Sequence, residues 1–260
     1  MACITLLSDF GLQEASVAIA KGILMQHLPA TPIIDISHEI QPFNTGQAAY
    51  LLASAYPGFP QGTVHVLLFD LFSEVTPRLV LCEYSGHYFL TPDNGLLPLA
   101  LGAEVKDALL CFELTNEHTF PDWLHEAGKV IYSLQSKKPE GLGLSPLQLK
   151  ITQDKGAARF EAGVIMCEAI HIDHYENVVL NLTRRQFEQW GGNRPFRLVF
   201  VGMEEIEAIS NSYADVREGF KLCRFNSTGY LEICVNRGKA ASLFGLRLGG
   251  KQNDIKMIFE

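Results

Sequence analysis

Short apolar runs alternate with segments of helical periodicity in the first part of the chain. The runs at residues 3–7 and 33–36 predict two strands. Between them, apolar residues recur at helical spacing from Val17 to Leu24, and Pro29 marks the end of that helix. A strand, a helix and a second strand in succession are typical of an α/β domain with a mainly parallel central sheet.

A charged residue follows the most apolar of the predicted strands. Asn44, with Gln47 three residues later, predicts the capped start of a second helix, which ends at Pro57. Residues 63–69 then form a continuous β-branched and apolar run, as expected for a strand covered on both faces, and Asp70 comes directly after it. Open α/β sheets bind ligands at the carboxyl ends of their strands, so Asp70 is a candidate site residue.

Two further turn signals complete this half of the chain. Ser85-Gly86 separates the strand-like runs 78–84 and 87–91 and predicts a hairpin. Asn94-Gly95 predicts a turn before a short helix, and we interpret Asp93, Asn94 and Gly95 as mainly structural. The α/β pattern continues to about residue 134.

The pattern changes in the second half. Residues 135–158 are rich in Lys, Pro, Gly, Ser and Gln and predict a linker or a long surface connection. After Glu161, short strand-like runs are separated by turn residues, which indicates a compact β-rich domain; they lie at residues 164–167, 178–182, 196–201 and 230–235. We therefore expect an α/β domain over residues 1–150 and an all-β domain over residues 158–260.

Charge and cysteine content narrow the function classes. The formal net charge of -8 and the lack of a Lys/Arg run argue against a nucleic-acid partner, which would require a basic surface. The six cysteines form no C-x-x-C pair and mostly lie in apolar runs, as buried reduced thiols do. We expect a cytoplasmic protein without a structural metal.

Several common signatures are missing from the sequence. No apolar stretch reaches the roughly 18 residues that a membrane helix needs, and the N-terminus lacks the features of a secretory signal. The first predicted strand is not followed by a glycine-rich nucleotide-binding turn. Neither a P-loop nor the G-x-S-x-G and H-E-x-x-H motifs occur. These absences disfavour Rossmann-type methyltransferases, P-loop hydrolases, α/β-hydrolases and zincins.

Seven segments in the same order as in one known family carry a resemblance that spans nearly the whole chain. They are Ser8-Asp9-Phe10-Gly11 with Lys21-Gly22, Ile34-Asp35-Ile36-Ser37-His38-Glu39-Ile40, Gly62-Thr63-Val64-His65-Val66, Asp70, Pro92-Asp93-Asn94-Gly95-Leu96-Leu97, His171-Ile172-Asp173-His174-Tyr175-Glu176-Asn177 and Asn226-Ser227-Thr228-Gly229-Tyr230-Leu231-Glu232-Ile233. The chain resembles the adenosine-forming S-adenosyl-L-methionine (SAM) hydrolases, also called SAM hydroxide adenosyltransferases, which are related to fluorinating and chlorinating enzymes.

The resemblance implies an N-terminal α/β domain, a barrel-like C-terminal β domain and a homotrimer. It places the ligand, SAM or adenosine, between the N-terminal domain of one subunit and the C-terminal domain of its neighbour. SAM is the substrate in this family, so no cofactor is expected. Water or hydroxide attacks the ribose C5′ of SAM, and the products are adenosine and L-methionine.

The resemblance also implies binding roles. Asp9 would accept hydrogen bonds from both ribose hydroxyls, although a turn or a helix cap is the simpler explanation for such a residue. Asp173 would bind the methionine amino group, Tyr175 would stack on the purine, Asn177 would bind the adenine edge and Ser227 would hold the methionine end. A metal site around Asp173 is disfavoured, because neighbouring side chains of an extended segment point to opposite faces.

The catalytic part of the resemblance is less complete. The family is described as using an Asp, Arg and His triad to activate water, and Asp70 and Arg78 match the first two members. The histidine position falls on Pro121, so His118 or His125 would have to substitute. A bulky segment, residues 71–77, replaces the family's glycine-rich turn.

Three functions therefore stay open. The first is adenosine-forming hydrolysis of SAM. The second is a catalytically silent protein that binds SAM or adenosine as a sensor or an interaction module. The third is halogenation by chloride or fluoride, which needs a small desolvated anion pocket.

Overall fold

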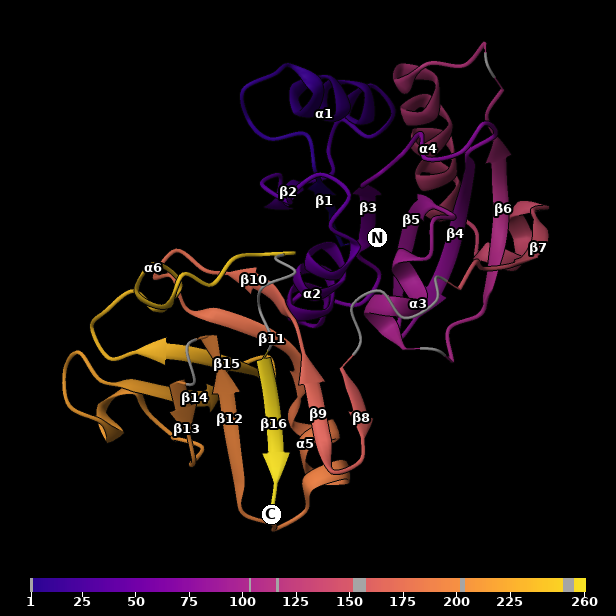
Figure 1. Ribbon diagram of the computed structural model, residues 1–260. Coiled ribbons are helices and arrows are strands. Elements are labelled where there is room, and N and C mark those ends of the chain that lie inside the picture. The colour runs from indigo at the N-terminus through magenta and orange to yellow at the C-terminus, as the bar shows by residue number, and fades with distance from the viewer. Residues whose placement is uncertain (1, 103, 116, 152–157, 202–203, 250–254) are drawn as a thin grey trace. The chain divides into compact units, whose positions relative to one another are not determined.

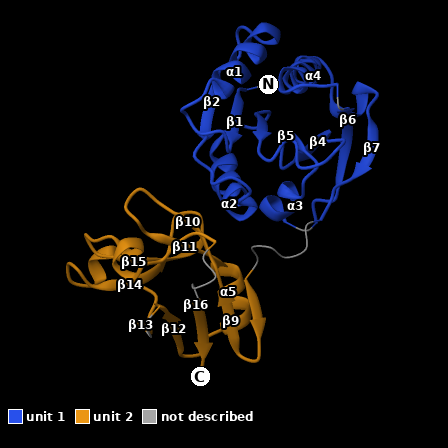
Figure 2. Ribbon diagram, turned by 45° about the horizontal axis from the view of Figure 1, so that its top comes forward, with its two compact units in different colours: residues 1–153 blue, residues 154–260 orange. Residues whose placement is uncertain are grey.

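The computed structural model describes the chain except for residues 1, 103, 116, 152–157, 202–203 and 250–254. It divides into two compact units, Met1–Gln153 and Asp154–Glu260 (Figure 2). The connection expected at residues 135–158 is partly structured, because η2 (Pro139–Leu142) and the strand β7 (Ser145–Gln148) belong to the first unit. The last part of that connection, residues 152–157, lies outside the described residues.

A seven-stranded sheet forms the centre of the first unit. Its strands lie in the order β2 (Ile33–Ser37), β1 (Ile4–Ser8), β3 (Val64–Leu68), β5 (His87–Pro92), β4 (Arg78–Tyr84), β6 (Asp107–Glu113) and β7. The first four are mutually parallel, whereas β4, β6 and β7 join by antiparallel pairing. The sheet is therefore mixed, and the expectation of a mainly parallel sheet was wrong for its second half.

The tight hairpin between β4 and β5 accounts for this difference. Ser85 and Gly86 both take positive φ values, 52° and 78°, as the two central residues of a type I′ turn do. Such a turn returns the chain directly alongside the strand it has just left, so β4 and β5 must be antiparallel. The predicted hairpin is confirmed, and it is the hairpin that makes the sheet mixed.

Helices cover both faces of this sheet (Figure 1). The helices α1 (Ser16–His27) and α4 (Phe120–Leu134) pack with one face, and α2 (Thr45–Ala55) and α3 (Leu96–Leu101) pack with the other. The predicted cap of the second helix is confirmed, because Asn44 Oδ1 accepts a hydrogen bond from Gln47 N at 3.0 Å. A short 3₁₀ turn, η1 (Tyr56–Gly58), ends that helix. Among the described helices, none has the length and apolar character needed to cross a membrane.

The second unit has two antiparallel sheets that share one apolar core. One sheet has the order β10 (Ala169–Ile172), β11 (Val178–Thr183), β15 (Tyr230–Val235) and β14 (Lys221–Phe225). The other has the order β13 (Glu204–Ile206), β12 (Phe196–Phe200), β16 (Ile255–Phe259), β9 (Val164–Cys167) and β8 (Arg159–Glu161). The β-rich pattern is confirmed, and the barrel-like closure stays a prediction.

Short helices connect the strands of the second unit. They are α5 (Arg184–Gly191), η4 (Tyr213–Asp215) and α6 (Ala240–Phe244). Gly191 ends α5 directly against the ring of Phe259, where an added Cβ would lie only 2.4 Å from a ring carbon. A glycine at this position therefore allows α5 to pack closely on β16.

Candidate functional site

Two aspartates lie together where the parallel strands end, a region we call the carboxyl end of the sheet. Asp9 directly follows β1, and Asp70 lies two residues beyond β3, which pairs with β1 as far as Ser8 and Leu68. Asp70 has a left-handed backbone conformation, with φ at 48°. The Asp9 carboxylate interacts with the backbone of Asp70, so the structure brings these two candidate residues side by side.

Burial makes both carboxyl groups harder to ionise. It is the largest cause that raises the pKa of Asp9, the charge of Asp70 acts in the same direction, and backbone hydrogen bonds offset part of the effect. Burial also raises the pKa of Asp70. Asp9 does not cap α1, whose N-cap is Ala15. Adjacent carboxyl groups with raised pKa at strand ends are typical of a functional site.

Arg78 reaches the same end of the sheet but has a different partner from the one that the resemblance suggests. It is the first residue of β4, which runs against β5, so it starts where β5 ends. Its Nη2 donates to Asp93 Oδ2 at 2.5 Å, and the Asp93 side chain is only 1% exposed. Asp93 Oδ1 also accepts from Lys150 N at 2.8 Å. Arg78 is therefore held by a buried carboxylate.

Sequence reasoning missed this role of Asp93. The residue was interpreted as part of a turn because Asn94-Gly95 follows it. An indication was present, since Asp93 follows the end of an apolar strand and a buried carboxylate requires a positive partner. The sequence did not identify that partner, because Arg78 lies 15 residues earlier, across the hairpin.

The segment between β3 and β4 combines a buried start with an exposed centre. Leu71 is buried, whereas Phe72 and Val75 are 54% and 79% exposed. Glu74 forms an ion pair with Lys150, which joins this segment to the chain beyond β7. The bulky residues that replace the family's glycine-rich turn therefore lie on the surface beside Asp70.

The position of the family histidine lies in the first turn of α4. Pro121 occupies that turn, where its fixed φ suits a helix start, and Thr119 and Asp122 form a capping box around it. The ring of Phe120 lies 5.2 Å from that of Phe10, edge to face, which brings this turn next to the segment that carries Asp9.

The two alternative histidines have different surroundings. His118 follows β6, which ends at the carboxyl end of the sheet, and its Nδ1 accepts from Thr115 N at 3.0 Å. His125 lies within α4, and its Nδ1 is 3.1 Å from His27 Nε2 on α1. Of the two, His118 lies at the end of the sheet that carries Asp9 and Asp70.

In the second unit, Asp173, Tyr175 and Asn177 lie in the turn between β10 and β11. Asp173 Oδ1 accepts from Tyr175 N at 2.9 Å and from Asn177 N at 2.8 Å, and Asp173 Oδ2 accepts from Asn177 Nδ2 at 2.9 Å. Asn177 is buried, whereas the Tyr175 side chain is 74% exposed. The structure brings these three candidate residues together, with the Asp173 carboxylate fixing the turn.

A polar network lies directly beneath this turn. Tyr213 Oη donates to Glu232 Oε1 at 2.8 Å and lies 3.5 Å from Asn177 Nδ2, while Arg224 lies over the Tyr213 ring and 3.5 Å from Glu232. Burial, followed by the influence of Glu232, raises the pKa of Tyr213 to about 12. Sequence reasoning assigned no role to Tyr213 or Arg224, because neither belongs to a segment that carries the resemblance.

Ser227 lies at the opposite end of the same sheet. It is an exposed residue in the turn between β14 and β15. In the ladder between β11 and β15, Val178 pairs with Ile233 and Thr183 with Tyr230, so this turn lies beyond Thr183, whereas Asp173 lies before Val178. Within this unit, the structure therefore does not bring Ser227 next to Asp173.

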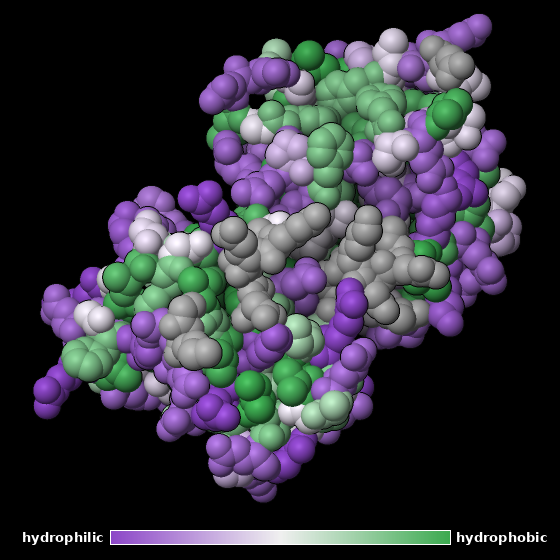
Figure 3. Space-filling view, in the orientation of Figure 1, coloured by the Kyte–Doolittle hydropathy of each residue, from purple (hydrophilic) through white to green (hydrophobic). Residues whose placement is uncertain are grey.

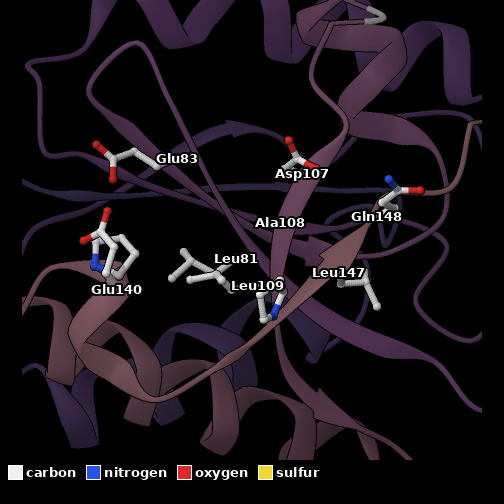
Figure 4. Close-up of a pocket in the computed structure, with 10 residues that line it drawn as sticks. Leu81, Glu83, Asp107, Ala108, Leu109, Glu140, Leu147 and Gln148 are labelled. Atoms are coloured by element: carbon white, nitrogen blue, oxygen red, sulfur yellow. The ribbon is translucent and has the colours of Figure 1, made fainter.

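A cleft of about 510 Å³ lies in the first unit (Figure 4), and neither Asp9 nor Asp70 is among the residues that line it. Its walls include Leu81, Leu109 and Leu147, and its polar side chains include Glu83 and Asp107. Glu83 is near the end of β4 and Asp107 begins β6, so the cleft opens toward the opposite, amino end of the sheet. The site that the strand ends define is therefore different from this cleft.

Both units match domains of one known protein family. The SAM hydroxide adenosyltransferase N-terminal domain matches residues 4–130, and the C-terminal domain of the same family matches residues 167–252. The two matches cover most of both units. The chain therefore belongs to the SAM hydroxide adenosyltransferase family.

Named relatives cover almost the whole chain. An (R)-S-adenosyl-L-methionine hydrolase of Thermus thermophilus is 28% identical over 94% of this chain and 95% of its own length. A hydrolase of the same name from Methanocaldococcus jannaschii is 29% identical over 94% of this chain and 92% of its own length. A fluorinase of Nocardia brasiliensis is 25% identical over 95% and 94%.

Solved structures agree with the fold. The crystal structure of an uncharacterized conserved protein from Thermotoga maritima matches with a TM-score of 0.79 and 25% identity, over 98% of this chain and 99% of that one. A conserved hypothetical protein from Thermus thermophilus matches with a TM-score of 0.73 and 26% identity, over the full length of both chains.

Proposed function

We propose that this protein hydrolyses SAM to adenosine and L-methionine by attack of water or hydroxide at the ribose C5′. The observation that carries the proposal is the pair Asp9 and Asp70, which lie together at the carboxyl end of the sheet with raised pKa values. Family membership and the named hydrolases support the choice of substrate.

The two aspartates have different roles in this proposal. Asp9 accepts hydrogen bonds from both ribose hydroxyls, an arrangement that suits the two oxygens of a carboxylate. Asp70 orients the attacking water, and Arg78, held by Asp93, supplies a positive charge at the same end of the sheet. The sulfonium loses its charge as the C5′–S bond breaks, so the methionine leaving group needs no general acid. Catalysis then depends on positioning of the water and the ribose.

The second unit supplies the remaining contacts in this proposal. Asp173 binds the ammonium group of methionine, Asn177 binds the adenine edge, Tyr175 stacks on the purine and Ser227 holds the methionine end. Three local hydrogen bonds already occupy the Asp173 carboxylate. A carboxylate has about four acceptor positions, so one stays available for an ammonium group.

We also propose that the active form is a homotrimer. Large apolar side chains are exposed in both units, among them Phe43 at 80% and Phe220 at 59%, and apolar patches interrupt the polar surface (Figure 3). Light scattering coupled to size-exclusion chromatography measures the mass directly. A mass near three times 28.9 kDa supports the trimer, and a monomer mass contradicts it.

One incubation tests the reaction. The protein is incubated separately with the (S) and (R) epimers of SAM, because the named relatives are (R)-SAM hydrolases, and the products are identified by mass spectrometry. Adenosine and methionine in equal amounts, absent with Asp70→Ala, support hydrolysis. If neither epimer yields adenosine above the Asp70→Ala control, the hydrolase proposal is wrong.

A second candidate is a catalytically silent protein that binds SAM or adenosine. The observation that favours it is Pro121 in the first turn of α4, where the family has its histidine. The ion pair of Arg78 with Asp93 also favours this candidate, because the resemblance expects Arg78 to act together with Asp70. Calorimetric binding of adenosine or SAM without product in the incubation selects this candidate. Chloride or fluoride added to the same incubation tests halogenation, which a 5′-halo-nucleoside would reveal.

A further inference from the structure

Four side chains from two of the resembling segments form one continuous polar chain, and none of them has a role in the proposed function. Lys21 Nζ donates to Asp35 Oδ2 at 2.6 Å. Asp35 Oδ1 lies 3.2 Å from His38 Nε2, and His38 Nδ1 lies 2.6 Å from Ser8 Oγ. The chain runs from the half-exposed surface of α1 and β2 to fully buried Ser8 at the end of β1.

The charges along this chain fix its hydrogen-bond direction. Burial alone would raise the pKa of Asp35, but the hydrogen bond from Lys21 and the close contact with His38 outweigh burial and hold the pKa below its ordinary value. The contact between His38 Nε2 and Asp35 Oδ1 does not have the geometry of a hydrogen bond. The negative charge of Asp35 nevertheless favours the tautomer of His38 that carries its proton on Nε2. Nδ1 is then an acceptor, and we assign Ser8 Oγ as its donor.

This arrangement resembles the side-chain order of serine hydrolases, but Ser8 cannot act as their nucleophile. Its side chain is fully buried, and a nucleophile must reach its substrate. A Ser8 hydroxyl that donates to His38 can still accept, and Phe10 N lies 3.5 Å from it. The chain therefore acts on the backbone that follows Ser8.

His38 holds that backbone on both sides of Asp9. Its ring binds Ser8 just before Asp9, and its carbonyl oxygen accepts from Gly11 N at 2.7 Å just after Asp9. Gly11 has a φ of 69°, a conformation that glycine adopts readily. Between these two anchors, Asp9 and Phe10 have little freedom to move.

We infer that His38, supported by Asp35 and Lys21, is a positioning residue that fixes the Asp9 carboxylate for the ribose hydroxyls of the ligand. The inference rests on the proposed function. It assigns to His38 an effect on the ribose hydroxyls in particular, whereas a residue that only stabilises the fold would weaken all ligands alike.

The experiment compares two ligands by isothermal titration calorimetry. Adenosine carries both ribose hydroxyls, and 2′,3′-dideoxyadenosine carries neither. Hydrogen bonds to a charged carboxylate are stronger than those between neutral groups, so the wild type should bind adenosine at least about tenfold more tightly than the dideoxy compound. In His38→Ala we expect this ratio to fall to about two, and His38→Asn, whose amide oxygen can accept from Ser8, should restore most of it.

His87→Asn is the matched control. His87 is equally buried, and its Nδ1 also has a ring partner, His65 Nε2 at 3.1 Å, but it starts β5 at the amino end of the sheet. The ratio of the affinities for adenosine and 2′,3′-dideoxyadenosine should be the same in His87→Asn as in the wild type. A His38→Ala ratio equal to the wild-type ratio overturns the inference and leaves the proposed function intact. Absence of adenosine binding by the wild type overturns both.

Asp35→Asn keeps the experiment decisive if His38→Ala does not fold. Asp35 is more than one-third exposed, so its substitution should leave the fold intact. Asp35→Asn removes the charge that favours one tautomer of His38. We therefore expect the ratio of the affinities for adenosine and 2′,3′-dideoxyadenosine to fall about threefold. An unchanged ratio in folded Asp35→Asn would contradict the role of the chain.

Discussion

The two ends of the seven-stranded sheet both carry carboxylates, but in different surroundings. At the carboxyl end, Asp9 and Asp70 are partly buried beside each other and have raised pKa values. At the amino end, Glu83, Asp107 and Glu140 are exposed around the cleft of about 510 Å³. The carboxylates with raised pKa values therefore lie where strand geometry brings them together and are not among the residues that line the cleft.

The histidines at the two ends show the same contrast. His38, at the carboxyl end, contacts Asp35, which forms an ion pair with Lys21. His65 and His87, toward the amino end, bond to each other among aromatic rings. Burial, followed by the charge of His87, lowers the pKa of His65 to about 3. One end therefore orders a polar histidine next to the segment that carries Asp9, and the other keeps neutral rings in the core.

The largest effect should follow a change at the carboxyl end. Asp70→Asn removes the carboxylate that we propose orients water, and we expect turnover of SAM to fall by roughly 10²–10⁴, with little change in KM. Steady-state formation of adenosine measures both parameters. Glu74→Gln, an exposed neighbour on the same segment, is the control and should stay within about twofold. Equal losses in both variants would argue against a specific role for Asp70.

The next effect concerns the ion pair that holds Arg78. Asp93→Asn leaves the Arg78 guanidinium without its buried partner, so the free energy of unfolding should fall by about 2–3 kcal/mol. Urea unfolding at pH 7 measures the loss. Lys129→Met removes the exposed pair with Glu126 and should cost less than about 1 kcal/mol. A loss for Asp93→Asn no larger than that of the control would contradict a structural role for the buried pair.

Acid should destabilise the first unit through the histidine of the amino end. The folded-state pKa of His65 is about 3, below its ordinary value of 6.5, so between these values the unfolded chain binds the proton and the folded chain does not. Stability is then complete above about pH 6.5 and decreases as pH falls toward 3, by about 2 kcal/mol at pH 5. Unfolding curves at pH 7 and 5 measure the difference. His65→Gln should reduce it, and an identical difference in that variant would exclude His65 as the source.

Asp9 should have a smaller effect on folding stability, and its contribution should change with pH in the opposite direction to that of His65. A raised folded-state pKa means that Asp9 favours folding below its ordinary pKa and that this contribution is lost as pH rises through the folded-state value. Asp9→Asn should therefore increase the free energy of unfolding at pH 7, with a smaller gain at pH 4, while adenosine binding decreases. Destabilisation at pH 7 would show that the Asp9 charge supports the fold.

The smallest effect should come from the cleft. Glu140→Gln changes an exposed carboxylate at the amino end, so stability should change by less than about 0.5 kcal/mol and turnover should not change. The same unfolding and turnover assays apply. Loss of turnover in Glu140→Gln would indicate that the active site lies at the cleft and not at the carboxyl end of the sheet.

The sequence predicted the local elements well because each has a short-range cause. The Asn44 cap, the Ser85-Gly86 hairpin and the strand that ends before Asp70 depend on neighbouring residues, and all three are confirmed. The antiparallel pairing of β6 with β4 was missed because it depends on which strands become neighbours in space. The strand β7 was missed for the same reason, since its polar sequence becomes a strand only beside β6.

The site was predictable in its individual residues and less so in its connections. Asp70 was identified from the end of its predicted strand and Asp9 from the family resemblance, and the structure places them side by side. The partner of Arg78, the network of Tyr213 and Glu232, and the link from His38 to Ser8 join residues distant in sequence. Periodicity and spacing do not report such contacts, because both describe only neighbouring positions along the chain.

Adenosine binding by calorimetry, compared among the wild type, Asp9→Asn and Glu140→Gln, tests the central claim most directly. The claim is that the carboxyl end of the sheet binds the nucleoside. It predicts binding by the wild type and Glu140→Gln with the same affinity, and a loss of at least about tenfold in Asp9→Asn. Undiminished binding by Asp9→Asn, together with a loss in Glu140→Gln, would contradict the claim.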